Sequence, residues 1–406
     1  HLKDGQVITA PMLAGAYQQM VEAGWCGISG NPKYDGAGFP GVVDVAVQEM
    51  LQSANMGFSL LPMLTRGVIH ALNLYGSDQQ KDSYLANLIS GVWSGTMNLT
   101  EPQAGTDLSA VKTKAVPQGD HFLISGQKIY ITWGDHDLAE NIIHLVLART
   151  PDAPAGNQGI SLFLVPKYLL NADGSLGERN DVKPVGVEHK LGIHSSPTCT
   201  LQFGDQGGAV GYLVGPENQG LMCMFSMMNN ARLHVGLQGV QIAERSTQQA
   251  LGYARDRVQS ARPHRGGNPV PIIEHPDVRR MLLRMKALTQ GARALLYLAA
   301  SNVDRARLGE EGARTRVDLL TPLAKGYGTD IGCEVASIGI QSHGGMGFVE
   351  ETGAAQHYRD ARIAPIYEGT NGIQAADLVG RKLTGDGGAG MATLIADVRA
   401  EAEDAR

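Results

Sequence analysis

The sequence has few cysteines, and none of them stands close to another. The four are Cys26, Cys199, Cys223 and Cys333. Without a CxxC pair or clustered metal-ligand residues, the sequence indicates no redox pair, no zinc site and no disulfide framework. We therefore expect reduced, buried thiols, no bound metal and a cytoplasmic location.

Long apolar runs and blocks of like charge are also missing. No apolar stretch approaches the roughly 20 residues that span a membrane, and no signal peptide is evident. The net charge is -6 with scattered Lys and Arg, which argues against nucleic-acid binding because that function needs a basic face. The chain runs from His1 to Arg406 without clear boundary signals, so we expect it to be a piece of a longer protein.

Aromatic residues make up only 5% of the chain, whereas glycine occurs 52 times and methionine 14 times. This composition predicts tight turns, close contacts between helices and an adaptable apolar pocket. A chain of 406 residues is long enough for two or three domains with well-buried cores.

The first 95 residues are predicted to be helical. Apolar residues recur at helical spacing from Leu13 to Val21, from Val43 to Ala54 and from Tyr84 to Ile89. Pro11 suits the first turn of the first helix, and Ser77 begins a capping box ahead of the third. A loop rich in glycine and proline, 30–41, separates the first two.

Short β-type runs begin near residue 95, and the helical period returns at about residue 217. The β-type runs are 121–124, 128–132, 142–147, 160–165, 198–203 and 210–214. Turn residues such as Ser125-Gly126 separate them, which predicts an antiparallel sheet or barrel. Long helices are expected at 222–252, 276–307 and 316–340, with a Pro/Gly loop at 262–271.

The order of these regions predicts an α+β protein. We expect a helical N-terminal domain at 1–95, a middle antiparallel β domain at 96–216 and a C-terminal helical bundle at 217–384. Residues 385–406 are predicted to start a further helical region.

The stretch 358–378 combines an acid with a glycine-rich turn. Glu368 follows the apolar Ile366 and Tyr367. A carboxylate beside apolar groups and without an adjacent cation has a raised pKa, which suits a general base near neutral pH. The turn 369–372 precedes a helix-like run, and free N–H groups at such a place favour an anion or a carbonyl oxygen. The residues leave open a plainer alternative, a surface acid ahead of a capped helix.

Two further stretches have the composition of ligand-binding loops. Residues 98–110 are rich in hydroxyls, with Pro102 and Gly105 fixing a non-helical path. Such a loop can hydrogen-bond a flat heterocycle or a diphosphate without bringing charge, although a domain linker would look similar. Residues 340–348 contain three glycines that permit close backbone approach to a ligand. They match neither a phosphate-binding P-loop nor a dinucleotide fingerprint, and His343 is better explained as a structural histidine than as a metal ligand.

A fourth stretch, 128–134, is a strand that ends in aromatic and hydroxyl groups. Tyr130 and Trp133 could flank a ring system, and Thr132 could donate to one of its nitrogens. Aromatic side chains on strands more often belong to the core.

Together these stretches resemble the acyl-CoA dehydrogenase family of flavoproteins. The runs that carry the resemblance are Leu-Thr-Glu-Pro-Gln-Ala-Gly-Thr-Asp at 99–107, Lys-Ile-Tyr-Ile-Thr at 128–132, Gln-Ser-His-Gly-Gly-Met-Gly-Phe at 341–348 and Tyr-Arg-Asp-Ala-Arg-Ile-Ala-Pro-Ile-Tyr-Glu-Gly-Thr at 358–370. The match covers roughly residues 20–380. The runs at 190–199 and 227–233 are similar to the larger bacterial members, which include enzymes for 3-(methylthio)propionyl-CoA and carry an additional C-terminal helical region.

The resemblance implies a fold, a reaction and partners. It implies N-terminal helices, a middle β domain and a C-terminal four-helix bundle, with FAD between the last two. Glu368 would remove the α-proton of an acyl-CoA thioester, and the β-hydride would pass to flavin N5 to give a trans-2-enoyl-CoA. The backbone N–H of Glu368 and a flavin ribityl hydroxyl would polarise the thioester carbonyl. Substrates would be 3-(methylthio)propionyl-CoA or a short- or medium-chain acyl-CoA, with electron-transfer flavoprotein as acceptor and a homodimer or larger oligomer.

The resemblance also assigns binding residues position by position. Around the flavin ring it implies Met97, Leu99, Thr100, Gly105, Thr106, Tyr130 and Thr132. Around the diphosphate and adenosine, in part from a neighbouring subunit, it implies Arg257, Gln341, Gly344, Gly345 and Thr370. Near the acyl-CoA it implies Thr106, Arg232, Tyr367 and Gly369.

At three positions, Ala231, Gly372 and Gln259, this sequence differs from other members of the family. Some members carry the base at the position of Ala231, which cannot act as one, so Glu368 has no competitor. Gly372 and Gln259 depart from the commoner polar residue and Thr, which bears on how FAD is held. An acyl-CoA oxidase would share these residues, and a non-enzymatic DNA-associated flavoprotein of the same superfamily would need a basic face that the charge of -6 does not favour.

Overall fold

The computed structural model describes residues 1–263 and 266–404 and divides into two compact units. The first unit comprises 1–39, 57–190 and 194–231, and the second comprises 40–56, 191–193 and the chain from 232 onwards. The loop predicted at 262–271 and the extension predicted at 385–406 each include two residues outside the described ranges. In the described ranges, no helix has the length and apolar character needed to cross a membrane. The predicted domain bounds stay a prediction.

The N-terminal helices of the first unit are α1 (Pro11–Glu22), α3 (Met56–Tyr75) and α4 (Asp78–Ser90). Helices α1 and α4 form where the apolar spacing predicts them, whereas α3 lies in the predicted helical region but outside the three periodic stretches. Leu13, Tyr17 and Met20 form the buried face of α1. The predicted capping box opens α4, with the side chains of Ser77 and Gln80 each bonded to the other's backbone N–H. A short hairpin of β1 (Leu2–Lys3) and β2 (Gln6–Val7) precedes these helices and was not predicted.

Helix α2 (Gly41–Ala54) belongs to the second unit, and the face predicted for its core was wrong. Its buried residues are Asp44, Val45, Gln48 and Gln52. Two residues of the predicted apolar face, Val43 and Met50, are 36% and 68% exposed. Periodicity finds the helix but cannot decide which side packs when the covering residues are themselves polar.

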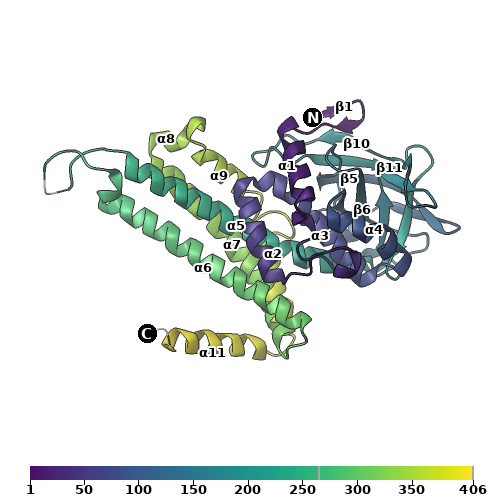
Figure 1. The fold of residues 1–406 in the computed structure, drawn as a ribbon. Coiled ribbons are helices and arrows are strands. Elements are labelled where there is room, and N and C mark those ends of the chain that lie inside the picture. Colours follow the sequence, from purple (N-terminus) through teal and green to yellow (C-terminus); the bar gives the residue numbers. More distant parts are fainter. Residues whose placement is uncertain (264–265, 405–406) are drawn as a thin grey trace. The chain divides into compact units, whose positions relative to one another are not determined.

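The core of the first unit is a curled sheet in the order β10-β11-β5-β12-β7-β6-β3, with β4 paired to β5 (Figure 1). All pairings in it are antiparallel, as predicted, except the parallel pair β3–β6. The strands are β3 (Trp93–Asn98), β4 (Lys114–Gln118), β5 (His121–Thr132), β6 (Asn141–Ala148), β7 (Ser161–Pro166), β10 (Val182–Val187), β11 (Thr198–Phe203) and β12 (Ala209–Val214). A separate antiparallel hairpin, β8 (Tyr168–Leu170) with β9 (Leu176–Arg179), lies between β7 and β10 in the chain.

The turn predicted at Ser125-Gly126 does not exist, because the two flanking runs form one bent strand, β5. Its first half pairs with β4 and β12 and its second half with β11. A Cβ on Gly126 would lie 2.6 Å from the hydroxyl oxygen of Thr113. Glycine therefore permits a close crossing inside the strand here, a use that a sequence cannot tell from a turn.

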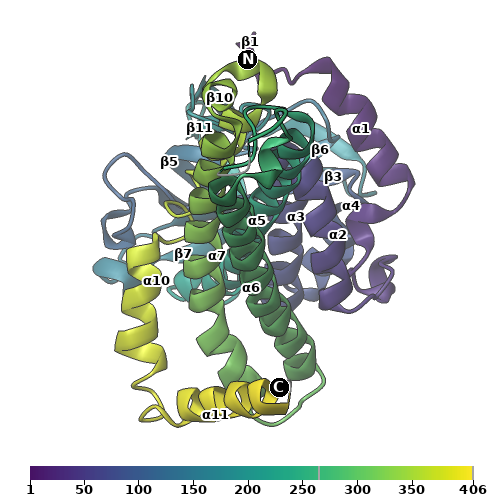
Figure 2. The same cartoon turned by 90° about the vertical axis from the view of Figure 1, so that its left-hand side faces the viewer.

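Three long helices dominate the second unit: α5 (Gly220–Asp256), α6 (Pro276–Arg307) and α7 (Ala313–His343). The first turns of α5, up to Ala231, belong to the first unit. Helices α6 and α7 lie side by side, and the shorter α8 (Gly345–Phe348), α9 (Ala354–Ala361) and α10 (Asn371–Asp377) follow (Figures 1 and 2). The final helix, α11 (Ala389–Asp404), crosses the N-terminal end of α7 and buries Leu394 in the bundle core.

Helices α5 and α7 approach closely because glycines face each other. A Cβ on Gly239 would lie 1.9 Å from the carbonyl oxygen of Gly328, well inside van der Waals contact. The close approach brings side chains of both helices to the loop that follows Ile363. The glycine-rich composition thus contributes to the position of the candidate site.

Candidate active site

A tight loop between α9 and α10 carries Glu368. The N–H of Asn371 donates to the carbonyl of Pro365 at 3.0 Å and closes the loop. Glu368 itself has a φ of 56°, and Gly369 follows with a φ of 83°. A non-glycine residue in this left-handed region is strained by the order of 1–3 kcal/mol, and such strain concentrates at functional sites.

Helix α5 fixes the loop from one side. The guanidinium of Arg232 donates to the carbonyl oxygen of Glu368 at 3.2 Å, and the hydroxyl of Tyr367 donates to the side chain of Gln238 at 2.5 Å. On the other side, the amide of Gln374 donates to the carbonyl of Gly369 at 3.2 Å. Arg232 and Gln238 thus hold the loop from positions distant in the sequence, and Gln374 holds it from the helix that follows.

The carboxyl group of Glu368 has a raised pKa, in the direction expected from the sequence. Burial raises it to about 7, although Arg232 and Lys325 both act to lower it. No cation adjoins Glu368 in the sequence, but α5 and α7 bring these two from positions far along the chain. Across the described residues the carboxylate makes no ion pair, so neither cation neutralises it directly.

Part of the anion cradle expected at 369–372 is already used inside the protein. The side chain of Thr370 accepts the N–H of Ile373, and the N–H of Asn371 closes the loop. In contrast, the N–H of Glu368 donates to no acceptor among the described residues. Among the described residues, the N–H groups of Gly369, Thr370 and Gly372 also lack an acceptor, so free donors lie both at the acid and in the turn that follows it.

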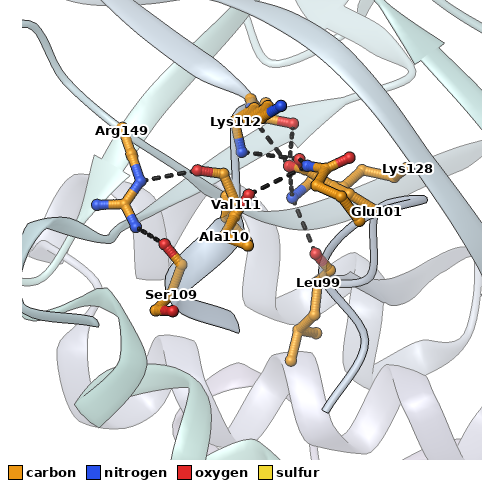
Figure 3. A network of polar contacts seen from close by, with 10 residues as sticks. Leu99, Glu101, Ser109, Ala110, Val111, Lys112, Lys128 and Arg149 are labelled. Carbon is orange, nitrogen blue, oxygen red and sulfur yellow. Dashed lines mark hydrogen bonds and ion pairs between the residues drawn. The ribbon is translucent and has the colours of Figure 1, made fainter. Parts of the chain in front are cut away.

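In the first unit, a buried ion pair holds the loop that follows β3 (Figure 3). The ammonium of Lys128 lies 2.8 Å from the carboxylate of Glu101 and also donates to the carbonyl of Leu99 at 3.0 Å. The same carboxylate accepts the N–H of Lys112 and both the N–H and the hydroxyl of Thr113. The loop was expected to bind a ligand without bringing charge to it. It does contain the charged Glu101, but that carboxylate is buried and paired with Lys128.

The pKa of Glu101 moves opposite to that of Glu368. Burial acts to raise it, but the charge of Lys128 and hydrogen bonds from Lys128, Thr113 and Lys112 lower it to about 2. Burial lowers the pKa of Lys128 to about 8 even though Glu101 opposes that shift. Both side chains lie inside the protein, at 3% and 0% exposure, so the pair is a fixed structural tie.

The Glu101–Lys128 ion pair holds the segment after β3 against β5, and both segments carry residues predicted to contact the flavin ring. The N–H of Ile129 donates to the carbonyl of Thr100 at 2.9 Å, and the hydroxyl of Thr96 donates to the carbonyl of Thr132 at 2.7 Å. Met97 and Leu99 lie on this same segment, whereas Gly105 and Thr106 follow on the exposed part of the loop.

The two aromatic residues of β5 have different environments. Tyr130 is 61% exposed and has a φ of 59° at the point where the pairing with β11 shifts register. Trp133 is fully buried, and its indole N–H donates to the carbonyl of Gly57 at 3.0 Å. The idea that both flank a ring system is wrong for Trp133, which belongs to the core.

The residues predicted for the diphosphate and adenosine fall into two groups within the second unit. Arg257 follows α5 and Gln341 lies near the end of α7, and the ring of Tyr253 packs on His343 at 4.5 Å to join these helix ends. Gly344 and Gly345 come next in the chain. Thr370 caps α10 beside Asn371, which is bonded to Lys325. The 16 residues of helix from Lys325 to Gln341 span about 24 Å, so one copy does not bring the two groups together.

His343 is a structural histidine, as the sequence indicated. It is 4% exposed, and its Nδ1 lies 2.7 Å from the carbonyl oxygen of Gly339. The four cysteines carry free thiols, three buried and Cys333 partly exposed.

A cavity of about 570 Å³ lies in the second unit, away from Glu368. Polar side chains of α2, α5 and α9 line it, among them Gln52, Gln241, Arg245 and His357. The described lining residues include none of the predicted site residues, so the cavity is not part of this site.

Several residues that shape the site were not predicted from the sequence. Lys325 and Gln238 are two of them, and the pairing of Lys128 with Glu101 was not predicted either. One signal was available in the sequence. Lys325 lies inside the apolar pattern of α7, next to Ala324 and about one turn after Leu320–Thr321. A lone charged residue at a core position of a helix indicates a buried partner.

Three family models match the chain in order. They are the acyl-CoA dehydrogenase N-terminal domain at residues 8–92, its middle domain at 96–206 and its C-terminal domain at 218–383.

Individual relatives agree with these models. The chain is 56% identical to 3-methylmercaptopropionyl-CoA dehydrogenase from Ruegeria pomeroyi over 394 residues, which are 95% of this chain and 66% of that protein. It is 30% identical to the short-chain-specific acyl-CoA dehydrogenase of Clostridium acetobutylicum, covering 90% and 88% of the two chains. The solved structure of butyryl-CoA dehydrogenase from Megasphaera elsdenii superposes with a TM-score of 0.77 at 28% identity, covering 93% and 91%. The chain spans about two-thirds of the length of the first of these and of the further large relatives.

Proposed function

The chain belongs to the acyl-CoA dehydrogenase family, and on that premise we propose that it oxidises an acyl-CoA thioester to the trans-2-enoyl-CoA with FAD as cofactor. The observation that carries the proposal is Glu368, an acid with a pKa of about 7 on a strained loop. A carboxylate that is half ionised near neutral pH suits the removal of a weakly acidic α-proton.

The donors of the first unit fit the neutral ring system of a flavin. Hydroxyl and amide groups of Thr100, Tyr130 and Thr132 lie on neighbouring segments, and the Glu101–Lys128 pair keeps its charges away from them. We assign Met97, Leu99, Gly105 and Thr106 to the same group of contacts. The FAD, when bound, supplies the acceptor for the β-hydride.

Glu368 acts as the base in this proposal. Its carboxylate takes the α-proton and becomes the neutral acid, which the burial of the loop favours. The free N–H of Glu368 donates to the thioester carbonyl, and one such preorganised donor typically lowers the barrier by about 3 kcal/mol. Arg232 holds the Glu368 carbonyl and Tyr367 is tied to Gln238, so these residues and Gly369 orient the loop against the acyl group.

The separation of the diphosphate residues supports a homo-oligomer of at least two chains. Lys325, which is bonded to Asn371 beside Thr370, lies about 24 Å along α7 from Gln341, and Gly344, Gly345 and Arg257 lie near Gln341. One FAD could use both groups only if a neighbouring subunit supplied one of them. Sedimentation of the flavin-loaded protein as a monomer would contradict this part.

We propose 3-(methylthio)propionyl-CoA as the first substrate to test and a short- or medium-chain acyl-CoA as the second. The identity to the Ruegeria pomeroyi relative supports the former, and the butyryl-CoA dehydrogenases support the latter. An electron-transfer flavoprotein in a bacterial cytoplasm would accept the electrons.

An anaerobic titration with each thioester tests the proposal. Absorbance of the protein-bound flavin should bleach with 3-(methylthio)propionyl-CoA or butyryl-CoA, and the thioester that bleaches at lower concentration is the preferred substrate. Rapid recovery of the colour on admitting oxygen would identify an oxidase. A yellow protein bleached by neither would contradict the proposal and favour a non-enzymatic flavoprotein.

A further inference from the structure

A buried contact joins α7 to the Glu368 loop and has no role in the proposed proton and hydride transfers. Lys325 of α7 is fully buried, and its ammonium donates to the side-chain oxygen of Asn371 at 2.8 Å. Asn371 stands three residues after Glu368 and closes the loop through its own N–H. A buried ammonium is costly unless its surroundings favour the charge, so its place beside this loop calls for a function.

Asn371 is bonded to α7 on both ends of its amide. Its side-chain NH₂ donates to the carboxylate of Asp330 at 2.8 Å and to the carbonyl of Gly326 at 3.2 Å, and Thr329 also lies within hydrogen-bonding distance. Several bonds to one helix fix the side chain, and the N–H to Pro365 passes that constraint to the loop. The residue after the cap Thr370 is therefore an anchor.

The charged groups around the base come from several elements. Arg232 of α5 and Lys325 of α7 face Glu368, and Tyr367 adjoins it in the loop. Lys325 in turn faces Arg232 and Asp330. Arg232 also interacts with Asp377 and Arg381, so part of its charge is balanced elsewhere.

We propose that Lys325 and Asn371 form a clasp through which α7 positions the Glu368 loop and supplies a positive charge that favours the ionised base. Lys325 is thus a positioning residue, because it acts through Asn371 and through its field. The role of the base rests on the proposed function, whereas the protonation of Glu368 can be measured without any turnover.

The test follows the Glu368 carboxyl group by infrared difference spectroscopy during a pH titration. The signal is assigned by its absence in Glu368→Gln. Removal of the cation in Lys325→Met should raise the midpoint by about one pH unit, because Lys325 lowers the pKa of Glu368. Lys325→Arg should restore much of the shift, and the exposed Lys286→Met should leave the midpoint unchanged.

Two outcomes would overturn the clasp. One is an unchanged Glu368 midpoint in folded Lys325→Met, which would leave the lysine a purely structural role. The other is an unchanged kcat in Asn371→Ala, which removes the bonds from the loop to α7. This variant keeps the charge of Lys325 and serves as the test if Lys325→Met does not fold. We expect Asn371→Ala to lower kcat at least tenfold at unchanged KM. If wild type shows no acyl-CoA bleaching but the infrared shift occurs, the proposed function fails and the clasp stands.

Discussion

Two glutamates, one in each compact unit, show how the same side chain serves opposite purposes. Glu101 is 3% exposed and accepts hydrogen bonds from four residues, Gln103, Lys112, Thr113 and Lys128. Against the effect of burial, the charge of Lys128 and the hydrogen bonds from Lys128, Thr113 and Lys112 lower its pKa to about 2. Glu368 is partly buried, but across the described residues no donor or cation pairs with its carboxylate, and desolvation raises its pKa to about 7. Burial acts in the same direction on both. Direct partners therefore decide whether a buried acid is a fixed tie or a group ready to exchange a proton.

The largest expected effect separates the two acids by chemistry. Glu368→Gln removes the base and should lower the rate of flavin bleaching about 10³-fold or more while FAD and acyl-CoA still bind. Stopped-flow absorbance measures the rate, and equilibrium binding of the thioester is the control. The exposed Glu351→Gln is the matched variant and should bleach normally. Normal turnover of Glu368→Gln would exclude Glu368 as the base.

The next effect separates them by stability. Lys128→Met leaves Glu101 buried without its cation and should lower the free energy of unfolding by about 3–5 kcal/mol, measured by denaturant unfolding. It should also weaken FAD retention, because the loop from Leu99 to Ala104 loses its tie to β5. The exposed Lys112→Met removes a nearby charge without breaking the pair and should change neither. Equal stability of the two variants would show that the pair is not a structural tie.

The dependence of stability on pH should run in opposite directions at the two sites. For Glu101 the pKa falls from 4.5 to about 2 on folding, so its contribution is present above pH 4.5 and is lost as the pH falls towards 2. For Glu368 the pKa rises from 4.5 to about 7, so stability declines as the pH rises through that window. Compared with wild type, Glu368→Gln should gain roughly 1–3 kcal/mol of stability at pH 8 and little at pH 4. Thermal unfolding of the two proteins at both pH values measures this difference. If the pKa of the carboxyl group were not perturbed, the difference in stability would be the same at pH 4 and pH 8.

The smallest effect concerns the tie between the Glu368 loop and α5. Tyr367→Phe removes one hydrogen bond to Gln238 and should lower the free energy that holds the loop in place by about 1 kcal/mol. We expect a modest fall in kcat with unchanged flavin content. A loss as large as that of Glu368→Gln would mean that the tyrosine hydroxyl takes part in the chemistry.

The sequence by itself determined the classes of element and the type of site. The regular spacing in Leu13–Met20, the capping box at Ser77 and the uninterrupted pattern from Pro276 to Arg307 are local signals, and each produced the expected helix. The motif around Glu368 identified the candidate base because apolar neighbours and a following glycine are visible in the chain itself.

Only the tertiary structure decided which groups face each other. No local pattern reveals that Asp44 and Gln48 rather than Val43 are buried on α2, that Gly126 lies inside one bent strand, or that Trp133 belongs to the core. Glu101 and Lys128 meet across 27 positions, and Lys325 reaches Asn371 across 46. The field at a carboxylate depends on distance in space and on the exclusion of water, so the opposite pKa shifts of Glu101 and Glu368 exist only once the chain has folded.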